Sequence, residues 1–326
     1  MSAMLEVRDL RVTLPTSRGP AQALRGIDFS LGRGETLGVV GESGCGKSMT
    51  ALALMGLLPA GAQMSGSIRL DGQELVGLAE PALCRLRGDR IAMVFQEPLT
   101  ALNPLHTVAR QIAEPLRLHR GLDARTARAE ALRLLERVRL PQAAQRLDAY
   151  PHQLSGGQRQ RVMIASALAC GPDLLIADEP TTALDVTTQR QILELIAEMV
   201  DDTGMALLLI THDLGVIAEN VRRMLVMYGG TVVEDGPTGE VFSRLSHPYT
   251  RGLFAARPRL GAGRATRLAT IAGRVPELAD LPPGCPYADR CPWVIEACRT
   301  APPPAFPTGP DHHARCIRLD AVRASA

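Results

Sequence analysis

A single lysine occurs in this chain of 326 residues, and it lies in residues 41–48, which read Gly-Glu-Ser-Gly-Cys-Gly-Lys-Ser. A drift of base composition toward arginine and alanine would explain why lysine is missing elsewhere, but not why it stays at Lys47. Lys47 completes the pattern G-x-x-x-x-G-K-[ST], which is typical of a loop that wraps phosphate groups. Such a loop needs a compact ammonium between the β- and γ-phosphates, where a planar guanidinium does not fit.

The flanks of this segment have the context that the pattern requires. Residues 36–40 predict a buried strand, and Ser48 begins an apolar helical stretch through Leu58. Glycines let backbone N–H groups converge on phosphate oxygens, and the helix directs its positive end toward the same charge. The predicted nucleotide-binding residues of the loop are Gly41, Glu42, Ser43, Gly44, Cys45, Gly46, Lys47, Ser48 and Met49.

Composition limits the class of protein. Apolar residues make up 46% of the chain, enough for a substantial core, and the net charge is +2. No basic run or aromatic platform accompanies that charge, so we expect no nucleic-acid partner. Residues 48–68 carry no charge and could be read as a membrane span, but Pro59 and the preceding phosphate loop favour a core helix and loop. With charges early in the N-terminus, we expect a soluble, cytoplasmic protein.

Alternation of apolar residues outlines an α/β core. Short alternating runs over 4–40 predict strands, and 91–95 predicts a buried strand. Residues from about 98 to 171 favour helices. Buried-strand patterns return at 174–177 and 206–210, with a helical run between them. The sequence therefore predicts an α/β fold that carries a helical insertion.

The pattern fails after Phe242, and residues 276–310 are rich in proline and irregular. Four cysteines fall here with the spacing C-x₅-C-x₆-C-x₁₇-C. They are Cys285, Cys291, Cys298 and Cys316. Four cysteines in a cytosolic, irregular segment favour a metal site over disulfides. The spacings of five and six residues between the first three cysteines are wider than those of structural zinc sites. Four thiolates suit an iron–sulfur cluster, while zinc and metal-free cysteines remain open alternatives. His312 and His313 could replace a ligand, but we expect a solvated pair.

Five further segments follow the phosphate loop in a fixed order. In chain order they are Gln96, residues 154–158 (Leu-Ser-Gly-Gly-Gln), 174–178 with Glu179, residues 183–185 (Ala-Leu-Asp), and His212. Together with the phosphate loop they resemble the ATPase subunit of ABC transporters, over residues 1 to about 242. The resemblance implies a P-loop ATPase core with an N-terminal antiparallel β-subdomain, a helical subdomain and an irregular, cysteine-containing C-terminal extension.

The resemblance also assigns chemical roles around ATP and Mg²⁺. Ser48, Asp178 and Gln96 are implied Mg²⁺ ligands, directly or through water. Glu179 is implied as the general base that polarises the attacking water, and His212 as the contact to the γ-phosphate. Gln96 would also join the core to the helical subdomain.

The resemblance also implies a second phosphate-binding helix N-terminus, at the signature loop. There Ser155, Gly156, Gly157 and Gln158 offer a hydroxyl and backbone N–H groups. In this family the loop binds the γ-phosphate held by the opposite subunit, and Asp185 belongs to the neighbouring aspartate loop. One chain would not complete a site, so a dimer is implied, most simply with a paralogous ATPase.

Further stretches are similar to the ATPases of oligopeptide and dipeptide importers. They are residues 95–104, 150–153, 178–187 and 247–250 (His-Pro-Tyr-Thr). This resemblance implies a nucleotide-binding domain over 1–242, with its helical subdomain at about 98–171, and an extension over 243–326. Nickel, glutathione and other small-solute importers share the group, so the solute stays open between them and peptides.

The implied assembly contains two membrane permeases and an extracytoplasmic solute-binding protein. The ATPase would lie at the cytoplasmic face of the bacterial inner membrane. A soluble ABC ATPase outside transport is the alternative class, but such proteins carry two cassettes or a long coiled coil, or lack the His-Pro-Tyr extension. Members of the dipeptide group hold a [4Fe–4S] cluster, so Cys285, Cys291, Cys298 and Cys316 are its implied ligands.

One departure concerns the nucleotide base. The family usually has an aromatic residue in its first strands that stacks on adenine. The first aromatic residue here is Phe29, in the strand before the loop, and Leu14 occupies roughly the expected place.

Overall fold

The computed structural model describes residues 3–182, 184–257 and 270–324. The chain divides into two compact units. Unit 1 contains Gly32–Glu35 and Gly77–Ile210, and unit 2 contains the segment up to Leu31, Thr36–Val76 and the segment from Thr211 onward. The domain boundary predicted at residue 242 stays a prediction, because both of its sides belong to unit 2.

A parallel three-stranded ladder forms the strand layer of unit 1. β7 (Leu174–Asp178) pairs with β6 (Ile91–Val94) on one side and with β8 (Ala206–Ile210) on the other. Every residue of the three strands is buried. A strand covered on both faces needs an unbroken apolar run, which explains why these strands were recognisable in the sequence. Asp178 is the polar exception and stands at the carboxyl end of β7.

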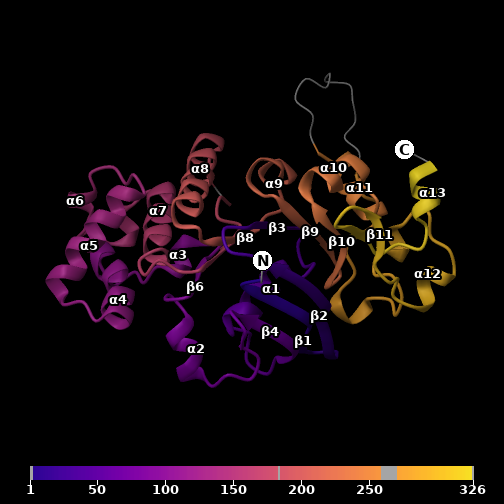
Figure 1. Ribbon diagram of the computed structural model, residues 1–326, viewed down its shortest axis with the longest axis horizontal. Helices are drawn as coiled ribbons and strands as arrows, with labels where there is room; N and C mark the ends of the chain where they lie inside the picture. Colours follow the sequence, from indigo (N-terminus) through magenta and orange to yellow (C-terminus); the bar gives the residue numbers. More distant parts are fainter. Residues whose placement is uncertain (1–2, 183, 258–269, 325–326) are drawn as a thin grey trace. The chain divides into compact units, whose positions relative to one another are not determined.

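Helices make up most of the rest of unit 1, and the helical region expected over 98–171 is present. The two longest helices of unit 1 begin with side-chain caps, because Asp123 and Asp185 accept backbone N–H groups of the first turns of α5 and α8. Figure 1 shows α4 and α5 side by side in magenta. The helices of unit 1 are α2 (Glu80–Leu86), α3 (Pro98–Ala101), α4 (Val108–Arg120), α5 (Ala124–Arg137), α6 (Ala143–Arg146), η1 (Pro151–Gln153), α7 (Gly156–Ala167) and α8 (Val186–Thr203).

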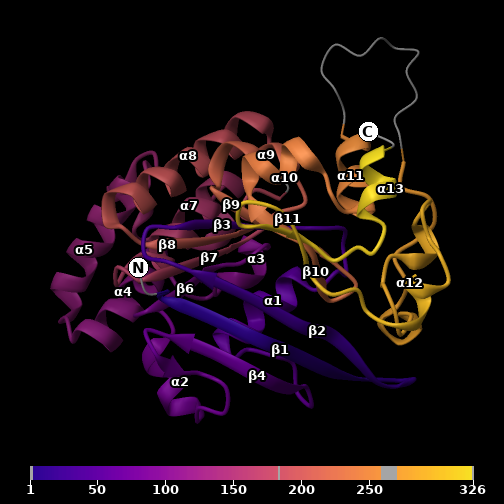
Figure 2. The same ribbon diagram turned by 45° about the vertical axis from the view of Figure 1, so that its right-hand side comes forward.

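Unit 2 begins with an antiparallel sheet of order β2-β1-β4-β5, whose long strands lie next to one another in Figure 2. Its strands are β1 (Leu5–Thr16), β2 (Gly19–Leu31), β4 (Gln63–Leu70) and β5 (Gln73–Glu74). The separate short runs expected before residue 15 form one strand, since an irregularity around Asp9 shifts the alternation without ending the pairing. The antiparallel strands β4 and β5 form a hairpin.

The second set of strands in unit 2 includes four that the sequence did not predict. β3 (Thr36–Val40) is parallel to β9 (Arg223–Tyr228), which pairs with β10 (Thr231–Pro237). β12 (His312–Ala314) then pairs with β10, and β11 (Phe306–Gly309) pairs with β12. The tail is therefore less irregular than expected, because β10 has an edge on which even a three-residue strand finds backbone partners.

The helices of unit 2 are mostly short. Helix α1 ends before Leu58, where its predicted end lay, because Gly56 adopts a left-handed conformation with φ of 62° and caps the helix. Across the described ranges, no helix combines the length and the apolar character needed to span a bilayer. The helices are α1 (Lys47–Met55), α9 (Leu214–Asn220), α10 (Thr238–Arg244), α11 (Pro248–Ala255), η2 (Leu278–Asp280), η3 (Ala288–Arg290), α12 (Ala297–Thr300) and α13 (Leu319–Ala324).

A buried carboxylate ties the tail to the strands of unit 2. Glu234 on β10 is 1% exposed and accepts the backbone N–H groups of Ser246 and His247, each at 2.8 Å. The Nε2 atom of His312 on β12 lies 2.9 Å from the same carboxylate. His312 is fully buried, so the expected solvated histidine pair is wrong for this residue. Burial lowers the pKa of His247 to about 4, against the opposing effect of the Glu234 charge.

Candidate functional site

The phosphate loop lies in unit 2 between β3 and α1, as expected. Lys47 is 6% exposed, and its Nζ donates to the carbonyl oxygens of Gly41 at 2.8 Å and Glu42 at 3.2 Å. The ammonium is therefore held over the loop by two backbone oxygens. Gly41 has no room for a side chain, because a Cβ atom there would lie 2.3 Å from the carbonyl oxygen of Met227.

The start of α1 is open toward solvent at the residue expected to bind Mg²⁺. Gly46 precedes the helix with φ of 107°, a conformation that favours glycine, and no side chain caps the first turn. Ser48 is exposed. A helix N-terminus without a capping side chain leaves backbone N–H groups to an anion.

The predicted base and the predicted glutamine meet in unit 1. Gln96 Nε2 donates to Glu179 Oε2 at 3.1 Å, and the Thr182 hydroxyl donates to the same oxygen at 3.0 Å. The Glu179 backbone N–H donates to Ile210 O at 2.8 Å. Glu179 has φ of 46°, a strained value for a residue with a side chain, and such strain is found mainly at functional positions. Asp178, the preceding residue, is 4% exposed.

The signature loop and the aspartate loop line one hollow of unit 1, with a volume of about 800 Å³. Ser155 caps α7 in a capping box, in which its Oγ accepts the N–H of Gln158 at 3.3 Å and the Gln158 side chain accepts the N–H of Ser155 at 3.0 Å. Gly156, Gly157 and Asp185 line the same hollow. Hydrogen bonds from the Thr188 hydroxyl and backbone lower the pKa of Asp185. Ala183, also expected in this region, lies outside the described residues.

The predicted nucleotide residues thus belong to two groups. The phosphate loop and His212, which is exposed, are in unit 2. Gln96, Asp178, Glu179 and the signature loop are in unit 1. The two residues considered for contact with the nucleotide base are both in unit 2. Phe29 is 8% exposed within β2, and Leu14, at the position where an aromatic residue was expected, is half-buried in β1.

All seven cysteines lie in the described part of the chain and carry free thiols. Burial, followed by the charges of Cys291, Cys316 and Cys298, raises the pKa of Cys285 to about 12, so the four tail cysteines influence one another. Burial likewise raises the pKa of Cys316 to about 11. In the described ranges, however, no three His, Cys, Asp or Glu side chains are arranged to hold a metal ion. The structure gives the predicted iron–sulfur cluster no support.

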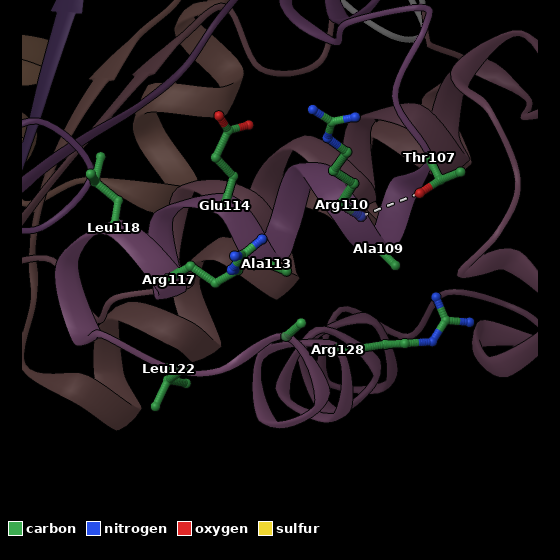
Figure 3. A pocket seen from close by; sticks show the side chains of 10 residues that line it. Thr107, Ala109, Arg110, Ala113, Glu114, Arg117, Leu118, Leu122 and Arg128 are labelled. Atoms are coloured by element: carbon green, nitrogen blue, oxygen red, sulfur yellow. Dashed lines mark hydrogen bonds between the residues drawn. The ribbon is translucent and has the colours of Figure 1, made fainter.

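A second hollow of unit 1, with a volume of about 590 Å³, lies along α4 and α5 (Figure 3). Its cationic side chains outnumber its acidic ones, and the apolar side chain of Leu118 beside them is 73% exposed. The sequence pointed to this helical region but not to a particular surface. The lining residues are Thr107, Ala109, Arg110, Ala113, Glu114, Arg117, Leu118, Leu122, Ala124 and Arg128.

Sequence reasoning missed two residues that contact the phosphate loop from the C-terminal segment. The Tyr249 hydroxyl accepts the N–H of Glu42 at 2.7 Å, and Arg290 forms an ion pair with the Glu42 carboxylate at 2.7 Å. Tyr249 carried a signal, since it belongs to the His-Pro-Tyr stretch. Arg290 carried none, because it is one of many arginines in an irregular segment.

Two family models match the chain. Residues 24–182 match the family described as ABC transporter, and residues 233–298 match the family described as oligopeptide/dipeptide transporter, C-terminal region.

Curated relatives match over nearly the whole chain. The oligopeptide transport ATP-binding protein OppD of Mycobacterium tuberculosis is 51% identical over 99% of this chain, which spans only 53% of that protein. The chain therefore covers about half the length of this mycobacterial relative. A putative peptide import ATP-binding protein of Brucella melitensis is 48% identical, with 98% of both chains covered. OppD of Salmonella typhimurium is 50% identical over 93% of this chain and 90% of its own length.

Solved structures match the fold at lower identity. The dimeric ATP-binding cassette MJ0796, in a post-hydrolysis state bound to ADP and Pi, is 30% identical with a TM-score of 0.65. The match covers 72% of this chain and 99% of that one. CbiO1 from Clostridium perfringens, part of an ABC transporter complex, is 29% identical with a TM-score of 0.62, over 75% of this chain and 92% of its own.

Proposed function

The chain belongs to the family of ABC transporter ATP-binding proteins, and from this premise we propose that it hydrolyses ATP to energise the import of peptides across a membrane. The contact between Gln96 and Glu179 carries the proposal, since it places a carboxylate and a polar amide together. The carboxylate would take a proton from the attacking water, and the amide would orient that carboxylate. Phosphoryl transfer depends chiefly on such positioning and on charge stabilisation.

Lys47 supports the same reaction from unit 2. Its ammonium is held by two carbonyl oxygens and is available to phosphate oxygens, while the open start of α1 adds backbone N–H groups. His212 would contact the γ-phosphate. Ser48, Asp178 and Gln96 supply only oxygen ligands, the set that Mg²⁺ prefers. When bound, the ion would neutralise charge on the phosphates.

We also propose that the working site is shared between two ATPase subunits. Ser155 and the backbone of Gly157 stand at the N-terminus of α7, where they would bind the γ-phosphate held by a second subunit. The solved relative MJ0796 is described as a dimer, which supports this arrangement. A paralogous ATPase is the partner we favour over a second copy.

The hollow along α4 and α5 is our proposed contact for the permeases. It combines an exposed leucine with arginines, so it suits a short amphipathic segment that carries acidic residues. The subunit would then lie peripherally at the cytoplasmic face of the bacterial inner membrane, below two permeases. An extracytoplasmic solute-binding protein would complete the importer.

The peptide substrate rests on the relatives rather than on a pocket, because an ATPase of this kind need not touch the solute. Relatives from Brucella and Salmonella are named for peptide or oligopeptide import, and the C-terminal family model carries the same description. Nickel, glutathione or another small solute is the alternative. We further propose the division into a nucleotide-binding domain over 1–242, with a helical subdomain at 98–171, and an extension over 243–326.

Assembly should control the rate of hydrolysis. We expect the purified chain alone to release phosphate from ATP slowly, and a complex with the permeases and a second ATPase to be at least about tenfold faster, because each signature loop must complete a partner's site. Phosphate release in detergent or in reconstituted vesicles measures both rates. Peptide and nickel are supplied in turn with the solute-binding protein.

The rates separate the alternatives. Stimulation by peptide alone supports peptide import, and stimulation by nickel alone moves the subunit to a metal importer. Full activity in a sample shown to be monomeric would contradict the shared site. A protein that copurifies with no permease would instead support a soluble ATPase outside transport.

We propose, finally, that Cys285, Cys291, Cys298 and Cys316 hold one [4Fe–4S] cluster with a structural role. The proposal rests on the chemistry of four free thiols in one segment, and metal binding would favour the thiolate forms that burial disfavours. We expect about four irons and four sulfides per chain in anaerobically purified protein, with visible absorption. Zinc instead of iron would change the metal but keep the site. Protein without metal would exclude the cluster.

A further inference from the structure

Arg290, in the cysteine-bearing C-terminal segment, forms an ion pair with a residue of the phosphate loop. Its Nη1 donates to Glu42 Oε2 at 2.7 Å, and its Nη2 donates to Glu42 Oε1 at 3.1 Å. The two parallel bonds make a bidentate contact, the strongest form of an arginine–carboxylate pair. The Arg290 side chain is 4% exposed and that of Glu42 is 29% exposed, so water screens the pair only partly.

Other contacts fix the guanidinium in this position. Nε donates to the carbonyl oxygen of Ala272 at 2.8 Å, and Nη1 also donates to the Tyr228 hydroxyl at 3.2 Å. The guanidinium carbon lies 5.7 Å from the ring centroid of Tyr228 and 5.9 Å from that of Tyr287. Burial alone would lower the pKa of Arg290, but the bonds to Glu42 and Tyr228 raise it, so the side chain is a permanent cation.

The Glu42 backbone is held from the same part of the chain. Its N–H donates to the hydroxyl of Tyr249, whose ring is fully buried in α11. Tyr249 packs against Tyr228 at 4.7 Å and against Tyr287 at 5.4 Å between ring centroids. The carboxylate and the N–H of this loop residue therefore both have partners that follow it by more than two hundred residues.

The negative charge of Glu42 is unfavourable in a loop that binds an anion. Its carbonyl oxygen lies 3.2 Å from the ammonium of Lys47, so its carboxylate belongs to the residue next to the phosphate-binding cation. An unpaired carboxylate here would repel a triphosphate and compete with it for Lys47. Arg290 cancels that charge from the side of the loop facing the C-terminal segment.

We propose that Arg290 is a positioning residue of the phosphate loop, which neutralises Glu42 so that the loop accepts a nucleoside triphosphate. The inference rests on the proposed function, because it concerns ATP binding at the same loop. It assigns part of the nucleotide affinity to the C-terminal segment. The competing interpretation is a bridge that merely anchors this segment, in which case both partners matter equally.

The two interpretations give opposite signs for single variants. The test is to measure the dissociation constants of the full-length protein for a fluorescent ATP analogue and for the corresponding ADP analogue. Arg290→Gln leaves the Glu42 charge unpaired, so we expect ATP affinity to fall about tenfold and ADP affinity to fall less. Glu42→Gln removes the repelling charge, so affinity for ATP should rise about threefold. A simple anchor predicts a loss in both variants.

Rescue provides the decisive comparison. The double variant Arg290→Gln with Glu42→Gln should return to within about twofold of wild-type affinity. Arg290→Lys keeps the charge but loses the bidentate geometry, so its ATP affinity should lie between those of Arg290→Gln and the wild type. A double variant as weak as Arg290→Gln would overturn the proposal. So would a loss of ATP affinity in Glu42→Gln equal to that in Arg290→Gln.

Thermal melting of each variant separates binding from folding. If Arg290→Gln does not fold, Glu42→Gln decides alone, because tighter ATP binding supports the proposal and weaker binding overturns it. Failure of the wild-type protein to bind either analogue would refute the proposed function itself. Wild-type binding with variants that all match it would refute only the role of Arg290.

Discussion

Replacing Glu179 by glutamine should lower the rate of ATP hydrolysis by about a hundredfold or more while leaving ATP binding in place. The substitution keeps the size of the side chain and its contacts to Gln96 and Thr182, but it removes the group that accepts the proton. Phosphate release by the assembled complex measures the rate, and nucleotide binding is measured on the same sample. We expect a complex that holds ATP without turning it over.

A carboxylate elsewhere is the matched control for this result. Glu219 is exposed on α9 and is not among the residues proposed to act on ATP, so Glu219→Gln should hydrolyse ATP at the wild-type rate. Normal turnover by Glu179→Gln would remove Glu179 from the proposed mechanism. A loss of ATP binding in that variant would instead assign it a role in binding.

Replacing Lys47 by alanine should weaken ATP binding by about a hundredfold, because it removes a charge-assisted hydrogen bond to the phosphates from a largely buried position. Lys47→Arg should fail almost as badly although it keeps the charge. The ammonium sits 2.8 Å from Gly41 O, in a space that a guanidinium does not fit. Titration with labelled ATP gives both affinities.

The control for the Lys47 substitutions is the replacement of another cationic side chain of unit 2. Arg222 is exposed, and its alanine variant should bind ATP as the wild type does. If Lys47→Arg bound ATP normally, the preference for a compact ammonium would be disproved. The survival of one lysine in an arginine-rich chain would then have no chemical cause in this loop.

The sequence predicted those features whose causes are local. A buried parallel strand needs an unbroken apolar run, so β7 could be recognised, and the acidic pair at its end followed. Lys47 could be recognised because its loop is contiguous in sequence. The ordered series of short motifs then identified Gln96, and the structure places its side chain against Glu179.

Contacts between distant segments escaped prediction. Arg290 and Glu42 are 248 positions apart, and neither residue stands in a pattern that indicates the other. β12 is only three residues long, too short for alternation to show, and depends on an available edge of β10. His312 was misjudged for the same reason, since its burial comes from Glu234 on that strand.

The bond between Glu234 and His312 has a consequence for synthesis of the chain. A ribosome adds roughly 5–20 residues per second, so the 78 positions between the two residues take roughly 4 to 16 seconds to make. During that interval β10 lacks its neighbour β12, and a carboxylate destined for the interior lacks one of its partners. The nascent protein therefore passes through a stage with an unpaired strand edge, and this edge is where we expect chaperones to bind.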